Sequence, residues 1–202
     1  MGLRQAGYEV VGVDINPQPK YPFEFHQADA MTFSLDDYDF IWASPPCQGY
    51  SHLTPESAKS NYQKLIPELR ERLIANGKPF CIENVAGARN ELINPIMLCG
   101  SMFGLRTQRH RFFETNFPIE APCACDHSEI PLLVTTASKA SRELRFKLGM
   151  KPKTVANASA AYDIDWMDFN GLREAIPPAY SRYIASSCKT PPTTNTPNTM
   201  KE

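Results

Sequence analysis

Four short expected strands, three of them apolar runs, constrain the fold of this chain more than any other feature. Buried parallel strands read as continuous apolar runs, and helical spacing of leucines between two of these runs, from Pro55 to Ala75, indicates a helix that Asn76-Gly77 ends. The alternation predicts an α/β protein with a doubly wound sheet. The four expected strands are Glu9–Asp14, Phe25–Ala28, Tyr38–Ala43 and Pro79–Ile82.

The remaining patterns divide the chain into a core, a lobe and a tail. We expect a core that carries the candidate catalytic residues over 1–117 and a small irregular lobe over 118–163. C-terminal helices over 164–187 should return to the core, and a disordered tail should follow over 188–202. Within these parts, further elements are expected over Leu3–Tyr8 (a helix end stopped by Gly7), Asn90–Met97 (helix), Met102–Phe113 (turn and strand), Asp168–Ala175 (regular structure) and Pro177–Ser187 (helix).

Composition excludes several classes of protein. The 202 residues suffice for one domain with a sizeable core. A net charge of -1 predicts no strong nonspecific affinity for polyanions, so a nucleic-acid surface would have to be a local patch. The first residues lack the apolar core of a signal peptide, and no apolar run approaches the ~20 residues of a membrane span. With six cysteines and no secretory signal, we expect reduced thiols and a cytoplasmic protein without membrane contact.

Acidic residues follow the first two expected strands. Asp14 ends the first run and Asp29 follows the second. Carboxylates at such positions of an α/β sheet hydrogen-bond the ribose of a nucleotide-like cofactor. The alternative for Asp14 is a turn aspartate before Asn16-Pro17. Two acids after successive strands favour the cofactor interpretation.

A cysteine follows the third expected strand, directly after paired prolines. Pro45 and Pro46 remove two amide donors, so the chain must leave the sheet there. Cys47 then lies at the carboxyl end of a strand, where a rigidly held nucleophile can act. The alternative is an inert cysteine beside a turn.

Two further patterns carry ionisable side chains. Glu83 lies at the end of the fourth strand, in Glu83-Asn84-Val85, where it can instead cap the next helix. Arg109 and Arg111 alternate with His110 on an expected strand, so the histidine points away from them and receives no catalytic role. The alternative for the two arginines is a solvated strand face.

Together these motifs resemble the DNA (cytosine-5) methyltransferase family. The Pro-Pro-Cys-Gln loop, the Glu-Asn-Val strand end and the arginine-rich strand occur in the family's order, and the resemblance covers most of residues 2–185. The closing stretch over 174–185 is similar to the last motif of compact, phage-type members. The resemblance implies a Rossmann-like, S-adenosylmethionine-dependent sheet with a small target-recognition lobe.

The resemblance also implies a chemistry. The family adds a thiolate to carbon 6 of a flipped cytosine, carbon 5 then takes the methyl group of S-adenosylmethionine, and loss of the carbon-5 proton releases the enzyme. Cys47 would be the nucleophile and must act as thiolate. Glu83 would contact N3 and the exocyclic amine, and Arg109 or Arg111 would bind O2 or hold Glu83 and the thiolate.

Binding residues follow in the same way. S-adenosylmethionine would contact Asp14, Ile15, Asp29, Ala30 and Pro46. Gln48, Tyr50 and Ser51 would line the pocket of the flipped base or contact a flanking phosphate. The basic stretch of the lobe would bind phosphates of double-stranded DNA, although a solvated charge run competes with this interpretation. Its residues assigned to DNA are Lys139, Arg142, Arg145 and Lys147.

We predict no metal site. Cys123, Cys125 and His127 resemble the start of a zinc site, but their spacing is tight and no fourth ligand follows at the usual interval, which favours a structural or incidental role.

The sequence departs from the family at its start. The family's first strand and Phe-x-Gly-x-Gly loop have no counterpart, because none of the ten glycines forms a Gly-x-Gly pair. We therefore expect a truncated methyltransferase with a gap between the strands ending at Asp14 and Ala43, weak S-adenosylmethionine binding, and a partner chain that supplies the strand. In addition, Thr107 replaces the glutamine that usually lies two residues before the first arginine.

The leading hypothesis is thus a DNA cytosine-5 methyltransferase of phage style, acting in restriction evasion or host-independent methylation in a bacterial or phage-infected cell. One alternative is a non-catalytic DNA-binding remnant or a subunit of a split methyltransferase. Another is a transfer RNA cytosine-5 methyltransferase, because one branch of the family modifies RNA with the same motifs.

Overall fold

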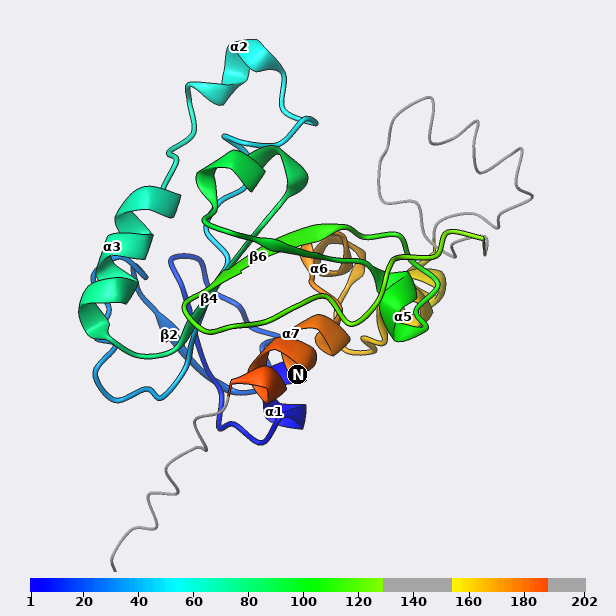
Figure 1. Ribbon diagram of the computed structural model, residues 1–202, viewed down its shortest axis with the longest axis horizontal. Coiled ribbons are helices and arrows are strands. Elements are labelled where there is room, and N and C mark those ends of the chain that lie inside the picture. The colour runs from blue at the N-terminus through cyan, green and yellow to red at the C-terminus, as the bar shows by residue number, and fades with distance from the viewer. Residues whose placement is uncertain (129–153, 189–202) are drawn as a thin grey trace, which may run out of the picture.

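The computed structural model describes residues 1–128 and 154–188 and shows a mixed α/β fold (Figure 1). Its larger sheet has four strands in the order β3 (Ile41–Ala43), β4 (Phe80–Asn84), β6 (Arg111–Thr115) and β5 (Ile96–Leu98). The β3 and β4 strands pair in parallel, whereas β6 is antiparallel to both of its neighbours. The mixed α/β class is confirmed, with parallel and antiparallel pairing in the same sheet.

A second, two-stranded sheet stands apart from the first. Strands β1 (Val11–Asp14) and β2 (Glu24–Gln27) pair in parallel, and neither hydrogen-bonds to a strand of the larger sheet in the described parts of the chain. Every residue of β1 and β3 is only half-buried, whereas β4 is buried along its whole length. The strands that end at Asp14 and Ala43 therefore belong to separate sheets, which agrees with the expected gap between them.

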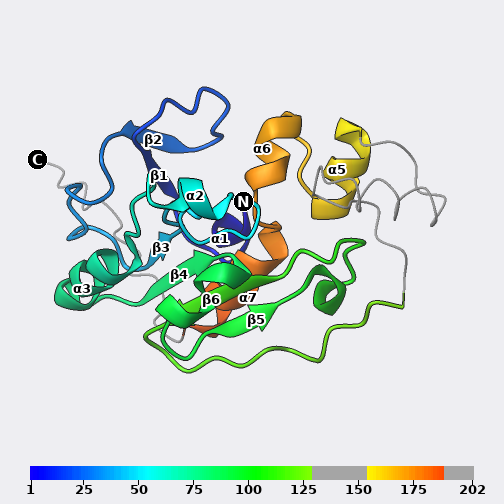
Figure 2. The same cartoon turned by 90° about the horizontal axis from the view of Figure 1, so that it is seen from above.

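Helices cover both faces of the larger sheet because β4 alternates its side chains between them. Phe80 and Ile82 pack with the buried side of α3 (Ile66–Asn76). Cys81 points to the opposite face and joins a cluster with α7 (Pro178–Ser187). Short α1 (Gly2–Gln5) packs against α7, and both views show the two side by side (Figures 1 and 2).

A smaller helical unit lies at one end of the sheet. Helices α5 (Val155–Tyr162) and α6 (Phe169–Glu174) pack together around Tyr162 and Leu172, both fully buried. The side chain of Asp168 caps α6 by accepting a hydrogen bond from the Gly171 amide at 2.9 Å. The predicted irregular lobe therefore contains a regular helix, and its hydrophobic cluster crosses the expected boundary at residues 163 and 164.

Other elements differ from the sequence expectations. The long helix expected from Pro55 splits into α2 (Glu56–Lys59) and α3, with Pro67 in the first turn of α3. The helix expected over Asn90–Met97 is wrong. This stretch holds the end of η1 (Ala86–Glu91) and then β5. Asn94 has a left-handed φ of 44° directly before Pro95, and neither feature permits a continuing helix.

Short η2 (Gly100–Phe103) connects β5 to the approach of β6. None of the helices in the described ranges is both long and apolar enough to cross a membrane.

Candidate active site

The Cys47 loop leaves β3 through a tight turn. The carbonyl of Cys47 accepts hydrogen bonds from the amides of Tyr50 at 3.0 Å and Ser51 at 2.9 Å. Gly87 of η1 approaches this turn so closely that a Cβ there would overlap the carbonyl oxygen of Tyr50. The turn is therefore held by its own hydrogen bonds and by close backbone packing, which fixes the position of the half-buried Cys47 thiol.

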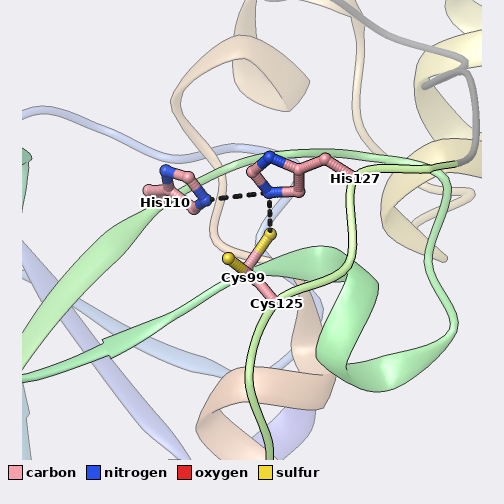
Figure 3. A group of neighbouring side chains, drawn as sticks. All are labelled: Cys99, His110, Cys125 and His127. Atoms are coloured by element: carbon pink, nitrogen blue, oxygen red, sulfur yellow. Dashed lines mark hydrogen bonds between the residues drawn. The ribbon is translucent and has the colours of Figure 1, made fainter.

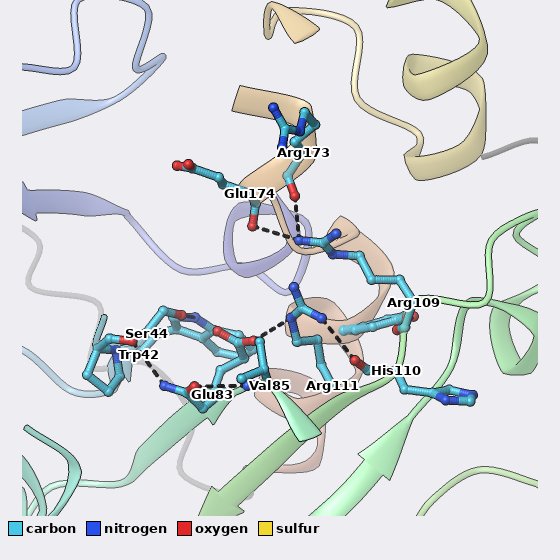
Figure 4. A network of polar contacts seen from close by, with 12 residues as sticks. Trp42, Ser44, Glu83, Val85, Arg109, His110, Arg111, Arg173 and Glu174 are labelled. Carbon is cyan, nitrogen blue, oxygen red and sulfur yellow. Dashed lines mark hydrogen bonds and ion pairs between the residues drawn. The ribbon is translucent and has the colours of Figure 1, made fainter. Parts of the chain in front are cut away.

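Glu83 and Arg111 form a buried ion pair between neighbouring strands. Glu83 belongs to β4 and Arg111 to the antiparallel β6, and Arg111 Nε lies 3.0 Å from Glu83 Oε1. Their side chains are 7% and 17% exposed. Arg111 also donates to the carbonyl of His110 at 3.0 Å (Figure 4). Since the pair is shielded from water, each charge depends on the other.

Asn84 ties the two loops together. It is 1% exposed, and its Nδ2 donates to the carbonyl of Pro45 at 3.0 Å while its Oδ1 accepts from the Val85 amide at 2.9 Å. This side chain thus fixes the Cys47 loop relative to the strand that carries Glu83. Sequence reasoning quoted Asn84 as part of a motif but gave it no role. A buried amide that follows a strand end would have been the available signal.

Arg109 turns away from this group. Its guanidinium donates to the Tyr162 hydroxyl at 3.1 Å. It also donates to the carbonyls of Arg173 at 2.8 Å and Glu174 at 3.1 Å (Figure 4). The guanidinium carbon lies 5.3 Å from the centre of the Tyr162 ring, and Arg109 is 6% exposed. Of the two arginines left open by the sequence, Arg111 pairs with Glu83 and Arg109 anchors the α5–α6 unit.

Burial and charge act in opposition on the candidate nucleophile. Burial raises the pKa of Cys47, the positive charge of Arg111 lowers it, and the negative charge of Glu83 raises it again. Burial likewise raises the pKa of the Glu83 carboxyl, against the charge of Arg111. The net direction is upward for both groups, so the resting site favours a protonated thiol.

The residues expected to bind a flipped base are divided. Gln48 is exposed beside Cys47. Tyr50 is 4% exposed and packs in the core with Ile66, so its side chain does not reach the surface. Ser51 Oγ accepts from the Leu53 amide at 3.1 Å within the loop. The four basic residues assigned to DNA, from Lys139 to Lys147, lie outside the described residues.

Four of the five expected cofactor residues lie at or just after the ends of β1 and β2. Asp14 Oδ1 accepts from the Asn16 amide at 2.7 Å, and Asp29 Oδ1 accepts from the Met31 amide at 2.8 Å. Each carboxylate keeps oxygen lone pairs for a further donor. Ile15 is 68% exposed and presents apolar surface next to Asp14. Ala30 accepts from Arg72 at 2.8 Å through its carbonyl, and Pro46 is exposed before Cys47.

The fold and this site define an α/β protein that brings a thiol, a carboxyl and a guanidinium together where strands end. Residues 15–97 match the family model of C-5 cytosine-specific DNA methylases, which includes Cys47 and Glu83. This match supports the resemblance to the DNA cytosine-5 methyltransferase family that the sequence motifs indicate. A search of curated proteins finds no match.

Proposed function

We propose that this chain carries the catalytic site of a DNA cytosine-5 methyltransferase that works through a covalent Cys47 adduct. The observation that supports it best is the Glu83–Arg111 ion pair, whose charges both act on the Cys47 thiol. A family match that includes the nucleophile loop agrees with this chemistry.

Each side chain has a distinct part in the proposed reaction. The Cys47 thiolate adds to carbon 6 of the cytosine, and the electron pair displaced by this addition moves toward N3 and carbon 5. Burial raises the pKa of the Glu83 carboxyl, which favours sharing of a proton between this carboxyl and N3 as charge accumulates there. Arg111 holds Glu83 and favours the thiolate form of Cys47. Asn84 is a positioning residue because it acts through the Pro45 carbonyl.

The ends of β1 and β2 suit an adenosine-containing cofactor. Asp14 and Asp29 offer carboxylate oxygens to ribose hydroxyls, and Ile15 offers apolar surface to a flat base. S-adenosylmethionine, when bound, would supply the methyl group to carbon 5. Its binding is part of the proposal, together with Ala30 and Pro46 as neighbouring contacts.

We also propose that a strand from a partner chain completes the fold between the two sheets. Tyr8 and Phe40, which precede β1 and β3, have their ring centres 5.6 Å apart, so the two strands start close together. Both strands are half-buried, although they contain apolar residues such as Ile41 and Trp42. An added strand would cover them and pair their free backbone groups.

The decisive experiment measures release of tritium from carbon 5 of cytosine. Thiolate addition at carbon 6 lets carbon 5 take a proton from water, and elimination of the thiolate then removes the tritium, so adduct formation is detected without a methyl donor. We expect Cys47→Ala to abolish the release and Glu83→Gln to lower it by about 10²-fold or more. Cys123→Ala, an exposed cysteine, is the matched control and keeps the activity.

Substrate and donor are tested in further arms of this assay. Double-stranded DNA, transfer RNA and no nucleic acid are compared, each with and without labelled S-adenosylmethionine. Tritium release from DNA supports the proposal. Tritium release from transfer RNA alone would show that the chain is a transfer RNA cytosine-5 methyltransferase. DNA binding without any release identifies a non-catalytic remnant. Release that survives Cys47→Ala contradicts the covalent mechanism.

A further inference from the structure

Four metal-ligating side chains converge at the end of the sheet opposite α3. Cys99 directly follows β5 and His110 directly precedes β6. Since Leu98 pairs with Arg111 in the antiparallel register, these two neighbours lie opposite each other. Cys125 and His127 come from the segment after β6, which folds back over this edge (Figure 3). The four side chains therefore reach one point from three separate parts of the chain.

The distances fit a tetrahedral zinc ion. One ligand atom of each of the four residues lies within 4.8 Å of all the others. His127 Nε2 lies 3.4 Å from Cys99 Sγ and 3.2 Å from His110 Nε2. Zinc bonds of about 2.3 Å to sulfur and about 2.0–2.1 Å to nitrogen place tetrahedral ligand atoms about 3.3 to 3.8 Å apart. Two measured separations are thus already close to these values.

The donor set selects zinc on chemical grounds. It contains two thiols and two imidazoles and no carboxylate, which disfavours calcium and magnesium. His110 and His127 stack with ring centres 5.1 Å apart and direct their Nε2 atoms at each other. A single hydrogen bond can join the Nε2 atoms of His110 and His127. The Nε2 atom of His127, however, also lies within hydrogen-bond distance of Cys99 Sγ. A cation at the centre would satisfy all of these lone pairs at once.

Outer hydrogen bonds hold the ligands in place. Ser101 Oγ donates to Cys99 Sγ at 3.3 Å and accepts from the Asp126 amide at 3.1 Å. Asp126 lies between Cys125 and His127, so this serine connects both halves of the cluster. Such supporting contacts orient ligands in protein metal sites. Exposed Cys123 has no place in the cluster.

We propose that Cys99, His110, Cys125 and His127 bind a structural zinc ion. Four protein ligands close the coordination sphere, as in zinc sites that stabilise folds. The ion would fasten the segment after β6 to the ends of β5 and β6. It would also fix His110, which lies between Arg109 and Arg111, and would thereby set the start of the strand that carries the Glu83 partner. This replaces the expectation of no metal site.

Metal analysis of the intact chain tests the site without any activity measurement. After purification with zinc and removal of loosely bound metal, we expect about one zinc ion per chain. Cys125→Ala and His127→Ala should lose the zinc, whereas Cys123→Ala, two residues away, should keep it. A zinc-free wild-type chain, or equal loss in Cys123→Ala, would overturn the proposal.

Cobalt substitution distinguishes a ligand from a residue that only supports folding. The wild-type chain loaded with Co²⁺ should show the absorption of a tetrahedral site with two thiolates. His127→Cys, which keeps a ligand, should still bind metal and should show stronger thiolate-to-cobalt absorption. If His127→Cys binds no Co²⁺ while its circular dichroism matches wild type, or binds it with an unchanged spectrum, then His127 is not a ligand and the site is refuted.

Discussion

Cys47 lies in a site where two opposite charges act on one thiol. Arg111 lowers its pKa and Glu83 raises it, while burial, the largest effect, raises it. The nucleophilic form is the thiolate. Reactivity of this cysteine should therefore increase as pH rises through its raised pKa, and the two neighbouring charges should shift the profile in opposite directions.

Alkylation kinetics measure this effect. With iodoacetamide and mass spectrometric detection of modified Cys47, we expect the rate profile of Arg111→Gln to move to higher pH, because a stabilising positive charge is lost. Glu83→Gln should move the profile to lower pH. Lys20→Gln, at an exposed ion pair with Asp168, is the control and should leave the profile in place. Shifts of the two site variants in the same direction would contradict the electrostatic account.

The sequence could identify Cys47, Glu83 and two arginines, but not which arginine reaches the carboxylate. Alternation along a strand places Arg109 and Arg111 on the same side, so local pattern treats them alike. The distinction comes from Tyr162 and from the carbonyls of Arg173 and Glu174, more than fifty residues further along. No local signal contains such partners.

At the scale of elements, a second buried ion pair joins α3 to the sheet. Arg70 of α3 meets Glu114 of β6 through two hydrogen bonds, at 2.6 and 2.8 Å. Glu114 also accepts from the Ile93 amide at 2.8 Å, and Arg70 donates to the Glu91 carbonyl. Their side chains are 12% and 4% exposed. The pair therefore ties the helix, the strand and the end of η1 together.

Removing one charge of this pair should destabilise the fold. Glu114→Gln keeps the side-chain shape but leaves Arg70 buried without its counter-charge, which costs about 3 kcal/mol. Urea denaturation followed by circular dichroism measures the loss of unfolding free energy. Glu56→Gln, in the exposed Glu56–Lys59 pair, is the control and should not change the midpoint. Equal effects of both substitutions would show that burial of the pair does not matter.

Most helices and strands could be predicted from the sequence, because the spacing of their apolar residues agrees with the residues that end them. The strand pattern at Phe80 and the glycine end of α3 at Gly77, with φ of 74°, are examples. The failure at Asn90–Met97 arose where Asn94 and Pro95 interrupt an otherwise helical composition. Cys125 and His127 were weighed as part of a zinc site, but Cys99 and His110 were missed for another reason. Spacing rules search along the chain, whereas antiparallel pairing brings Cys99 and His110 together across two strands.

At the scale of the molecule, the two sheets should differ in local stability. Strand β4 is buried along its length between β3 and β6, whereas β1 is half-buried and, within residues 1–128 and 154–188, pairs with β2 alone. Segments with less buried apolar surface open at lower free energy. Burial thus predicts two levels of protection within one chain.

Amide hydrogen exchange with mass spectrometry can measure these levels. We expect peptides from Phe80–Asn84 to exchange far more slowly than peptides from Val11–Asp14. A strand added by a partner chain would slow exchange in β1 and β3 and leave β4 unchanged. Uniform protection of both sheets in the chain alone would show that the smaller sheet does not open separately.

The anchor of Arg109 sets an order of events during synthesis. Cys47, Glu83 and Arg111 all leave the ribosome before Tyr162, which lies 53 residues beyond Arg109. A nascent chain thus contains every reactive group of the site while the guanidinium of Arg109 still lacks its hydroxyl and carbonyl partners. Arg109 lies two residues before the start of β6. The position of β6 and of its Arg111 is therefore fixed only when α5 and α6 have been made. Translation products that stop before residue 162 should carry the chemistry without the scaffold that holds it.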